Sequence, residues 1–467
     1  MNLPNIDRTP KAVTIPRTPL IFHGTFIHSI TPKEIDIIRD GLLVVSPRGK
    51  ILALLRNVSV REIPHYLAGL NLEGISVSTA PVQILKRGEF LIPGFLDTHN
   101  HAPQWAQRGT GRGHLIMDWL NKITFPHEAK FADPEYARRV YSKCVDGFLN
   151  QGVTTASYYG SLHGEATKIL AEICLNKGQR ALVGKCNMAR YGADFYTDKS
   201  SQESLDVTED FIAHVKKLDP TGSLVQPIIT PRFAICCDEE LLAGLGKIAQ
   251  RESTMMIQTH FDEARQEVSL TRQLFPQFSN EADLYSHFGL FNDRCIMAHC
   301  VYPNDYEIAK LLECQVGVAH CPVSNTTGGE WGAAPIRRYL DMGIKVGLGT
   351  DNGGGFSCSI LEAIRQALIT SNGRSTMTGH KEASISLYEA FYLATLGGAK
   401  VCGMSDRVGS FARGKEFDAL KITTVAPQCI STLIEDDDSI EVVFEKFLMS
   451  GDDRNIESVY VQGRSVK

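Results

Sequence analysis

The chain has 467 residues, of which 43% are hydrophobic and 22% charged, as expected for a folded protein with a large core. The net charge of −5 arises from 48 basic and 53 acidic residues without a basic block, which argues against nucleic-acid or anionic-membrane partners. No stretch approaches the roughly 18 apolar residues of a membrane span, and the N-terminal sequence lacks the apolar core of a secretory signal. The twelve cysteines are scattered without a CxxC pair, so we expect reduced thiols and a cytoplasmic protein.

Both ends of the chain are rich in β-branched residues with alternating polarity, a pattern that predicts strands. We expect these strands at residues 20–30, 41–45, 51–56, 74–77, 419–423, 440–447 and 458–461. Two β-rich ends predict one small β-sandwich domain that is formed by both termini, from residues 1–90 and 401–467.

Residues 91–400 show a different pattern, in which short apolar runs alternate with helical stretches such as 134–150 and 238–251. Eight runs occur, at residues 89–99, 152–157, 181–187, 224–230, 254–260, 294–299, 315–320 and 345–351. Apolar strands between helices are typical of a parallel sheet that is buried on both faces. Eight such repeats predict an α/β fold with a (β/α)8 TIM barrel, and a doubly wound open sheet is the alternative. The first strand ends in DTHNH rather than in a GxGxxG turn, which disfavours a dinucleotide site.

Polar side chains with ligand chemistry end several of these strands. They are, in chain order, His99, His101, His260, His299, His320 and Asp351. Active sites of TIM barrels lie at the carboxyl ends of the strands, so we expect these side chains to meet at one mouth. One histidine at a strand end is usually structural, but the joint pattern predicts a metal site.

The spacing of two residues between His99 and His101 places both imidazoles on the same face of a strand. Together with His260 and Asp351 they offer three nitrogens and one carboxylate oxygen, a set that suits zinc or iron. A water at a remaining position of the metal would be acidified to a near-neutral pKa.

Glu263 stands three residues after His260 and could carry a proton from that water to a substrate nitrogen, with Asp262 as a weaker candidate. On its own, Glu263 would be an acid in the first turn of a helix, where acids are favoured. His299 could hydrogen-bond the water or a tetrahedral intermediate. His320 could act directly or from behind the ligands.

Residues 91–101, LIPGFLDTHNH, resemble the PGxxDxHxH opening of the amidohydrolase superfamily, and residues 347–351, GLGTD, resemble its final barrel strand. The flanking β segments resemble the split β-sandwich of that superfamily, so the resemblance covers the chain from about residue 20. Two-metal members carry a bridging lysine at strand four, where this chain has IITPRF at 228–233. The resemblance therefore implies the one-metal deaminase branch.

Within that branch the chain resembles the guanine deaminase family. The resemblance rests on HAPQ at 101–104, TFP at 124–126, TPRF at 230–233, GTDNGG at 349–354, ATLGGA at 394–399 and GKEFDA at 414–419. It implies a homodimer with one zinc ion per subunit, and the implied zinc ligands are His99, His101, His260 and Asp351.

The resemblance also implies the reaction, which is the hydrolytic deamination of guanine to xanthine and ammonia. Glu263 would be the proton shuttle, and His299 and Asp351 would act with it in catalysis. The implied substrate-binding residues are Gln104, Arg232, Phe233 and His260. An arginine fork suits the acceptors O6 and N7 of guanine, a glutamine side chain offers both a donor and an acceptor, and a phenylalanine ring can stack on the purine.

Two alternatives stay open at this point. Small changes in the pocket would suit another ring, such as adenine, 8-oxoguanine, cytosine or a triazine. A non-catalytic scaffold on the same fold is the other alternative, although such a protein should have lost ligands and every proposed position is filled here.

Overall fold

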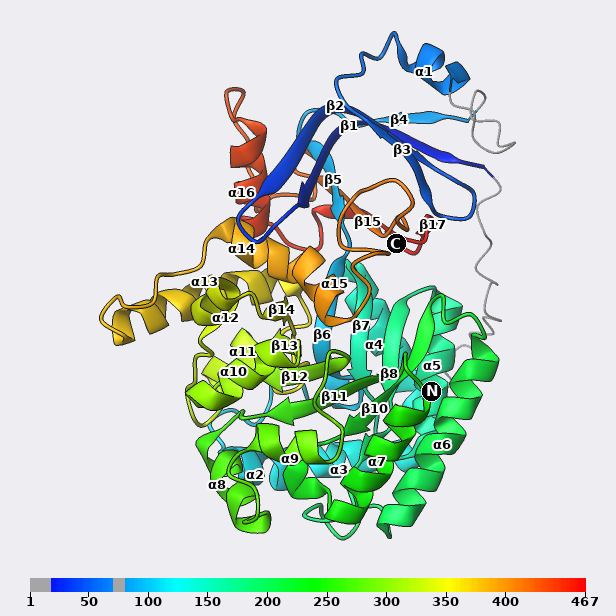
Figure 1. The fold of residues 1–467 in the computed structure, drawn as a ribbon. Helices are drawn as coiled ribbons and strands as arrows, with labels where there is room; N and C mark the ends of the chain where they lie inside the picture. The colour runs from blue at the N-terminus through cyan, green and yellow to red at the C-terminus, as the bar shows by residue number, and fades with distance from the viewer. Residues whose placement is uncertain (1–17, 70–79) are drawn as a thin grey trace, which may run out of the picture.

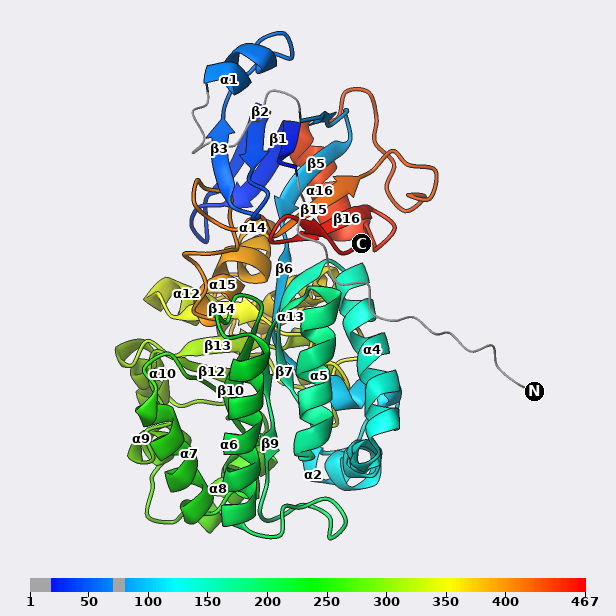
Figure 2. The same ribbon diagram turned by 90° about the vertical axis from the view of Figure 1, so that its right-hand side faces the viewer.

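The computed structural model describes residues 18–69 and 80–467. It has two parts, a barrel of parallel strands ringed by helices and a smaller sheet at one end of the barrel (Figures 1 and 2). The smaller sheet contains the first and the last strands of the chain, so the two ends of the sequence lie together. Within the two described ranges, no helix is long and apolar enough to cross a membrane.

Eight parallel strands form the barrel, in the hydrogen-bonded order β14-β13-β12-β11-β10-β8-β7-β6. Their bounds are β6 (Phe95–His101), β7 (Val153–Tyr159), β8 (Arg180–Gly184), β10 (Val225–Pro231), β11 (Met256–Phe261), β12 (Cys295–His299), β13 (Gly317–His320) and β14 (Lys345–Leu348). The short β9 (Cys186–Asn187) pairs with the end of β10. Each strand overlaps one of the eight predicted apolar runs, and the predicted barrel is confirmed.

Side chains bridge the first and the last strand of the barrel. Thr98 Oγ1 of β6 donates to the carbonyl oxygen of Leu348 in β14 at 2.8 Å. Asp97 accepts hydrogen bonds from Thr350 N at 2.9 Å and from Thr350 Oγ1 at 2.6 Å. Because these contacts join β6 to the segment after β14, the strands form a nearly closed barrel rather than an open sheet.

The longer helices pack on the outside of the barrel (Figure 2). The predicted helices at 134–150 and 238–251 are confirmed, and each begins after an aspartate, Asp133 or Asp238, whose side chain accepts a backbone N–H of the first turn. The helices that follow the barrel strands or line its ends are α2 (Ile116–Trp119), α3 (Phe125–Glu128), α4 (Pro134–Asn150), α5 (Gly164–Lys177), α6 (Ser201–Leu218), α7 (Glu239–Arg251), α8 (Arg265–Leu274), α9 (Glu281–His287), α10 (Asp305–Glu313), α11 (Pro322–Thr327), α12 (Ile336–Met342), α13 (Ile360–Met377), α14 (Leu387–Tyr392) and α15 (Gly398–Val401).

The terminal sheet has the order β17-β16-β15-β5-β1-β2-β3, with β4 also paired to β1. Its strands are β1 (Leu20–Ser29), β2 (Ile35–Val45), β3 (Ile51–Leu55), β4 (Val82–Ile84), β5 (Glu89–Pro93), β15 (Ala419–Thr423), β16 (Ile456–Val461) and β17 (Arg464–Ser465), and α1 (Ile63–Gly69) lies beside them. Most neighbours are antiparallel, and β5 and β15 join the N-terminal to the C-terminal strands. Phe22 packs on Phe417 and Tyr460, with ring centroids 5.3 and 5.7 Å apart. The predicted β domain from both termini is confirmed.

The predicted strand at 89–99 is two strands that belong to two different sheets. β5 lies in the terminal sheet and β6 in the barrel, and Gly94 separates them. A Cβ at Gly94 would lie 2.1 Å from Thr154 Oγ1, so only glycine fits this passage between the sheets. The division of the chain into domains at residues 90 and 400 stays a prediction.

The predicted strand at 440–447 is wrong, because α16 (Ile440–Ser450) occupies these residues. Its buried side chains are Val443, Phe444, Phe447 and Leu448, which recur at the spacing of one helix face. Ser439 caps the helix, and its side chain accepts a hydrogen bond from Val442 N. The predicted strand at 74–77 lies outside the described residues.

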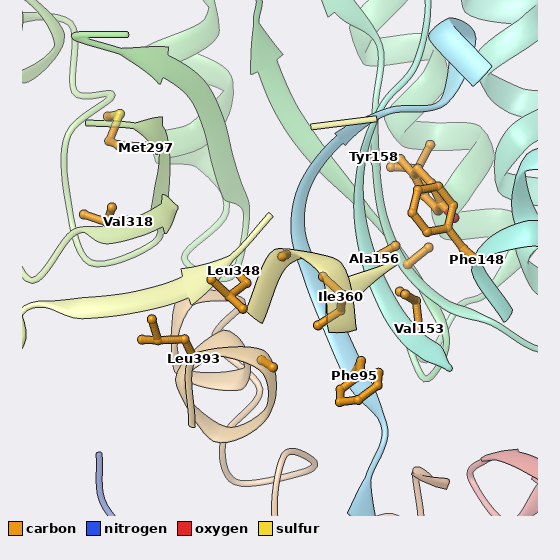
Figure 3. Close-up of a cluster of buried hydrophobic side chains, with 14 of the residues drawn as sticks. Phe95, Phe148, Val153, Ala156, Tyr158, Met297, Val318, Leu348, Ile360 and Leu393 are labelled. Atoms are coloured by element: carbon orange, nitrogen blue, oxygen red, sulfur yellow. The ribbon is translucent and has the colours of Figure 1, made fainter. Parts of the chain in front are cut away.

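Successive side chains of β7 point alternately to the helix-covered core and to the inside of the barrel near its mouth. Tyr158 points outward and packs on Phe148 of α4 with ring centroids 5.8 Å apart, in the buried cluster of Figure 3. The next residue, Tyr159, faces the interior and lies 5.0 Å from the ring of His99 and 4.6 Å from that of His101. Successive side chains of a strand point to opposite faces, so the same strand fixes the core and walls the site.

Candidate active site

Four histidines and one aspartate meet at the carboxyl ends of the barrel strands. They are His99 and His101 in β6, His260 in β11, His299 at the end of β12 and Asp351 after β14, and each is at most 7% exposed. Among the described residues, three triplets bring ligand atoms within 4.8 Å of one another; they are His99–His260–His299, His99–His101–Asp351 and Glu263–His299–Asp351. The predicted convergence of these strand ends is therefore found in the fold.

The ligand atoms face one another at short range. Nε2 of His101 lies 3.2 Å from Nε2 of His260, and Oδ1 of Asp351 lies 3.4 Å from Nε2 of His99 and 3.5 Å from Nε2 of His101. Within the part of the chain that the structure describes, both ring nitrogens of His99 are buried without a hydrogen-bond partner. Buried polar atoms are rarely left unpaired, so this cluster is built to hold a group that satisfies them.

The electrostatics of the cluster fit a cation. Burial lowers the pKa of His99, and burial together with the neighbouring imidazoles lowers the pKa of His101 and His260 well below the ordinary value. Burial opposes ionisation of Asp351, but the close approach of His99 and the other nearby histidines holds its pKa well below the usual range. Neutral imidazoles and an ionised carboxylate are the protonation states in which these side chains bind a divalent metal.

The backbone turns sharply where two of these residues stand. His299 has φ of 75° and Asp351 has φ of 45°, both in the left-handed region that residues other than glycine seldom adopt. The backbone N–H of Asp351 donates to the carbonyl oxygen of His99 at 2.9 Å, which ties the turn to β6. Such strain is typical of functional sites, and here it turns both side chains into the mouth.

Hydrogen bonds to the outer ring nitrogens orient two of the histidines. Nδ1 of His260 donates to the carbonyl oxygen of Arg232 at 2.5 Å, and Nδ1 of His299 donates to Oδ1 of Asn325 at 2.8 Å. Each bond fixes the ring and leaves Nε2 for the mouth of the barrel. Asn325 in α11 was not predicted, because no spacing in the sequence connects it with His299.

Glu263 lies directly after β11, with Oε1 3.6 Å from Nε2 of His299. Burial and the negative charge of Asp351 raise the pKa of Glu263 to about 8. A carboxyl group with a pKa near neutrality can both accept and deliver a proton. Asp262 is instead buried on the far side of the turn, where its backbone N–H donates to Glu281 at 3.2 Å.

A hollow of about 910 Å³, including its opening to solvent, lies over the cluster. The four residues expected to hold the substrate all line it; they are Gln104, Arg232, Phe233 and His260. Glu263 and Asp351 line the same hollow, so the predicted binding residues and two of the three predicted catalytic residues share one cavity, and His299 lies next to Glu263.

His320 lies away from this hollow. It is 1% exposed at the end of β13 and borders a separate small cavity with Arg337 and Thr370. Burial lowers its pKa to about 3, so its ring is neutral. Of the two roles left open for His320, the position behind the ligands is the one that the fold allows.

Two sets of contacts that support the wall were not predicted from the sequence. Arg112 in the glycine-rich loop donates to the carbonyl oxygens of Gly353 and Gly354, at 2.9 and 2.5 Å. Gly353 has φ of 111°, and a Cβ there would lie 2.1 Å from Oε1 of Gln104. The second set comes from Glu128, the last residue of α3, which lies behind the wall and whose buried carboxylate contacts both Gln104 and Arg232.

The chain matches the amidohydrolase family over residues 90–466. A probable guanine deaminase of Schizosaccharomyces pombe is 40% identical, over 96% of this chain and 83% of its own length. The guanine deaminase of Dictyostelium discoideum is 38% identical, over 96% of this chain and 98% of its own length. Among solved structures, the guanine deaminase from C. acetobutylicum with guanine bound in its active site is 33% identical, with a TM-score of 0.86. That match covers 96% of this chain and 100% of the other.

These matches span both the barrel and the terminal sheet, and they agree with the histidine and aspartate cluster at the rim. The amidohydrolase family is metal-dependent, as the donor set of this cluster requires. The chain belongs to the amidohydrolase family, and its relatives group it there with the guanine deaminases.

Proposed function

We propose that this chain is a hydrolase that converts guanine and water to xanthine and ammonia. The observation that carries this proposal is the composition of one hollow. One part of its lining is His101, His260 and Asp351 of the cluster with Glu263. Another part is Gln104, Arg232 and Phe233, whose chemistry suits an oxo-purine. Relatives named guanine deaminases at 38–40% identity, and a related structure that holds guanine, support the same substrate.

We further propose one zinc ion per subunit, held by His99, His101, His260 and Asp351. Three imidazole nitrogens and one carboxylate oxygen are a ligand set typical of catalytic zinc. When bound, such an ion supplies Lewis-acid chemistry and lowers the pKa of a water toward neutrality. Metal analysis of the purified protein tests the proposal, with about one zinc per chain as the expected content.

Glu263 and His299 are placed to handle the attacking water. Oε1 of Glu263 and Nε2 of His299 are 3.6 Å apart, so both reach a water oxygen that approaches the ring from this side. The oxygen forms a bond to C2 of guanine while Glu263 accepts its proton and passes it to a ring nitrogen. Asp351 and His299 stabilise the tetrahedral intermediate. The C2 hydroxyl of the intermediate then gives up its proton, which Asp351 or His299 passes to the exocyclic nitrogen. The bond from C2 to that nitrogen breaks, the carbonyl at C2 forms, and ammonia leaves.

The binding residues position the ring for that attack. Phe233 is 2% exposed, and its ring centroid lies 6.0 Å from that of His260, so it offers an apolar face beside the cluster. Arg232 and Gln104 supply hydrogen bonds at the edge of the ring. Holding substrate and water in fixed orientation lowers the entropic barrier of the reaction.

We also propose a homodimer that works in the cytoplasm. Ile369 and Met377 of α13 are 62% and 71% exposed and offer an apolar surface to a second copy. All twelve cysteines lie in the described part of the chain and are unpaired, which suits a reducing compartment. Light scattering of the purified protein measures the mass directly, and twice 51.5 kDa is the expected value.

The decisive experiment incubates the zinc-loaded protein with guanine and follows its ultraviolet conversion to xanthine. Adenine, 8-oxoguanine, cytosine and a triazine are tested in parallel. Rapid turnover of guanine that is lost on chelation and restored by zinc is the expected result. Turnover of another ring alone would contradict the assignment of the substrate. No turnover of any ring despite bound metal would favour the non-catalytic alternative.

A further inference from the structure

The carboxylate of Glu128 is buried behind the wall of the hollow and surrounded by donors. Glu128 is 0% exposed and is not among the described residues that line the hollow, whereas Gln104 and Arg232 are. Its Oε1 accepts from Nε2 of Gln104 at 2.9 Å and from Nη2 of Arg232 at 3.3 Å. Its Oε2 accepts from the hydroxyl of Tyr196 at 2.7 Å and from Nη1 of Arg232 at 2.9 Å. These four donors occupy the whole accepting capacity of the carboxylate.

The contact with Glu128 decides which end of the Gln104 amide is free. An amide has one donating and one accepting end, and rotation by half a turn exchanges them at little cost. Since a carboxylate only accepts, Nε2 of Gln104 must point toward Glu128. Oε1 of Gln104 is left at the other end, where its one donor among the described residues is Gln107 Nε2, at the long distance of 3.4 Å.

The same carboxylate fixes the fork of Arg232. A guanidinium group has five N–H donors, and Glu128 takes one from each terminal nitrogen. The other neighbours of Nη1 are the sulfur atoms of Cys186 and Met188 at 3.9 Å, which are weak acceptors. Arg232 therefore stays a donor with N–H groups to spare, held in one plane by the paired contact.

We propose that Glu128 is a positioning residue that determines specificity, because it fixes Gln104 as an acceptor and holds the donors of Arg232 in one orientation. This inference rests on the proposed function, and it names the edge of the ring that the hollow selects. The selected ring carries an N–H donor beside a carbonyl acceptor, as an oxo-purine does. An amino-purine carries the reverse order, an accepting ring nitrogen beside an amino donor, and would leave both protein groups unmatched.

Hypoxanthine and adenine are the matched pair of probes. They share the purine skeleton and differ in the order of donor and acceptor at this edge, and neither carries the amino group that the proposed reaction removes. Their dissociation constants are measured by calorimetry on the metal-loaded full chain. We expect the wild-type chain to prefer hypoxanthine.

Glu128→Gln is the variant that tests the role. The amide of this glutamine has one accepting end and one donating end, so it cannot satisfy all four donors. The side-chain amide of Gln104 then becomes free to rotate by half a turn. We expect the preference for hypoxanthine over adenine to fall by about 10- to 100-fold. For guanine turnover, KM should rise by a larger factor than kcat falls, and the metal content should stay the same.

Glu128→Asp covers the case in which the first variant does not fold. It keeps the negative charge opposite Arg232 but withdraws the carboxylate by one methylene, which weakens its hold on Gln104. A loss of preference of about tenfold is expected. Asp198→Asn is the matched control, because Asp198 is a buried carboxylate that faces the buried Lys185 at 2.6 Å and lies outside the wall of the hollow. It should lower stability and leave the preference unchanged.

The outcomes separate this inference from the proposed function, because binding does not depend on turnover. The positioning role would be overturned if both Glu128 variants kept the wild-type preference for hypoxanthine over adenine, or if Asp198→Asn lost as much of this preference as they do. Either result would do so even if guanine is deaminated. Loss of the preference in the Glu128 variants of a chain that does not deaminate guanine would keep the positioning role and reject the proposed reaction. A wild-type chain that binds both probes equally would overturn the inference at the first measurement.

Discussion

The two ends of the barrel both bury charged and polar groups, but they treat them in opposite ways. At the carboxyl ends of the strands, both ring nitrogens of His99 and Nε2 of His299 have no hydrogen-bond partner in residues 18–69 and 80–467. At the amino ends, Arg180 is 0% exposed and its side chain donates to Glu416, Asp418 and the carbonyl oxygen of Ser223. The buried charge at the amino end is fully paired by other groups of the protein, and we call this end saturated. The buried ring nitrogens at the carboxyl end are left unpaired, and we call this end open.

This difference separates a structural site from a functional one on physical grounds. Buried polar atoms cost free energy unless they are paired, so a saturated network needs nothing from outside. An unsaturated cluster persists only if the fold holds it in place and an external group completes it. The amino-end network also joins the barrel to the terminal sheet, because Glu416 and Asp418 immediately precede β15. It should therefore govern stability, and the rim should govern turnover.

The largest effect is expected at the open end. Replacing Glu263 with Gln keeps the size of the side chain and removes its ability to accept a proton. We expect kcat for guanine to fall by roughly 10³-fold or more, with the metal retained, because the proton transfer loses its carrier. Turnover is measured by ultraviolet absorbance and zinc by metal analysis on the same sample. Full activity in this variant would show that another group moves the proton.

The saturated end should respond in stability and not in turnover. Arg180→Met leaves Glu416 and Asp418 buried with fewer cations, and breaking a buried ion pair from one side costs about 3–5 kcal/mol of unfolding free energy. Urea denaturation measures this loss. At 25 °C the folded, zinc-loaded variant should keep the turnover of the wild type.

An exposed pair supplies the control for that variant. Arg251 donates to Glu209 at 2.7 Å, but these side chains are 63% and 47% exposed. Arg251→Met should cost less than about 1 kcal/mol, because solvent screens the pair. Equal losses for the Arg180 and Arg251 variants would contradict the assignment of the amino-end network as the main link between the two parts.

Acid should weaken the same network in a defined pH range. Arg180, Arg407 and Lys50 contact the carboxylate of Glu416. Burial alone would raise the pKa of Glu416, but the two arginines outweigh burial and lower this pKa from 4.5 to about 2. A lowered pKa contributes stability that is present above pH 4.5 and is lost as the pH falls toward about 2. Allowing for partial solvent screening, the contribution is about 2 kcal/mol. In Glu416→Gln the free energy of unfolding should be lower than in the wild type at pH 7, and the gap should narrow below pH 4.5. A gap that is constant from pH 7 to pH 3 would contradict the ionic origin of the stability.

The two ends also differed in how far the sequence predicted them. The rim histidines were predictable because each ends an apolar strand, and a barrel brings the carboxyl ends of its strands to one mouth. The amino-end network was not predicted, since Arg180, Glu416 and Asp418 are far apart in the chain and no periodicity links them. Glu128 was missed for the same reason, although the adjacent TFP stretch was part of the resemblance.

The misassigned strand at 440–447 shows a second limit of the sequence. Its run of valine and phenylalanine is rich in residues that favour strands, and its buried positions satisfy the helical spacing as well. Only packing decides between the two, and here α16 places Phe444 and Phe447 against Phe90 of β5, with ring centroids 6.0 and 5.8 Å apart. Short apolar runs are ambiguous wherever the partner surface comes from the opposite end of the chain.

The smallest effect tests how the open end is kept in order. Oδ1 of Asn325 accepts from Nδ1 of His299 at 2.8 Å, which holds the imidazole with Nε2 toward Glu263. Asn325→Ala removes that acceptor without touching a proposed metal ligand, and losses of about 10-fold are usual for such supporting contacts. We expect kcat to fall by about that factor while KM changes little. Asn325→Asp keeps an oxygen acceptor in place and should restore most of the loss. If the alanine variant turns guanine over at the wild-type rate, the hydrogen bond does not orient His299. Packing around β12 would then hold the imidazole in place.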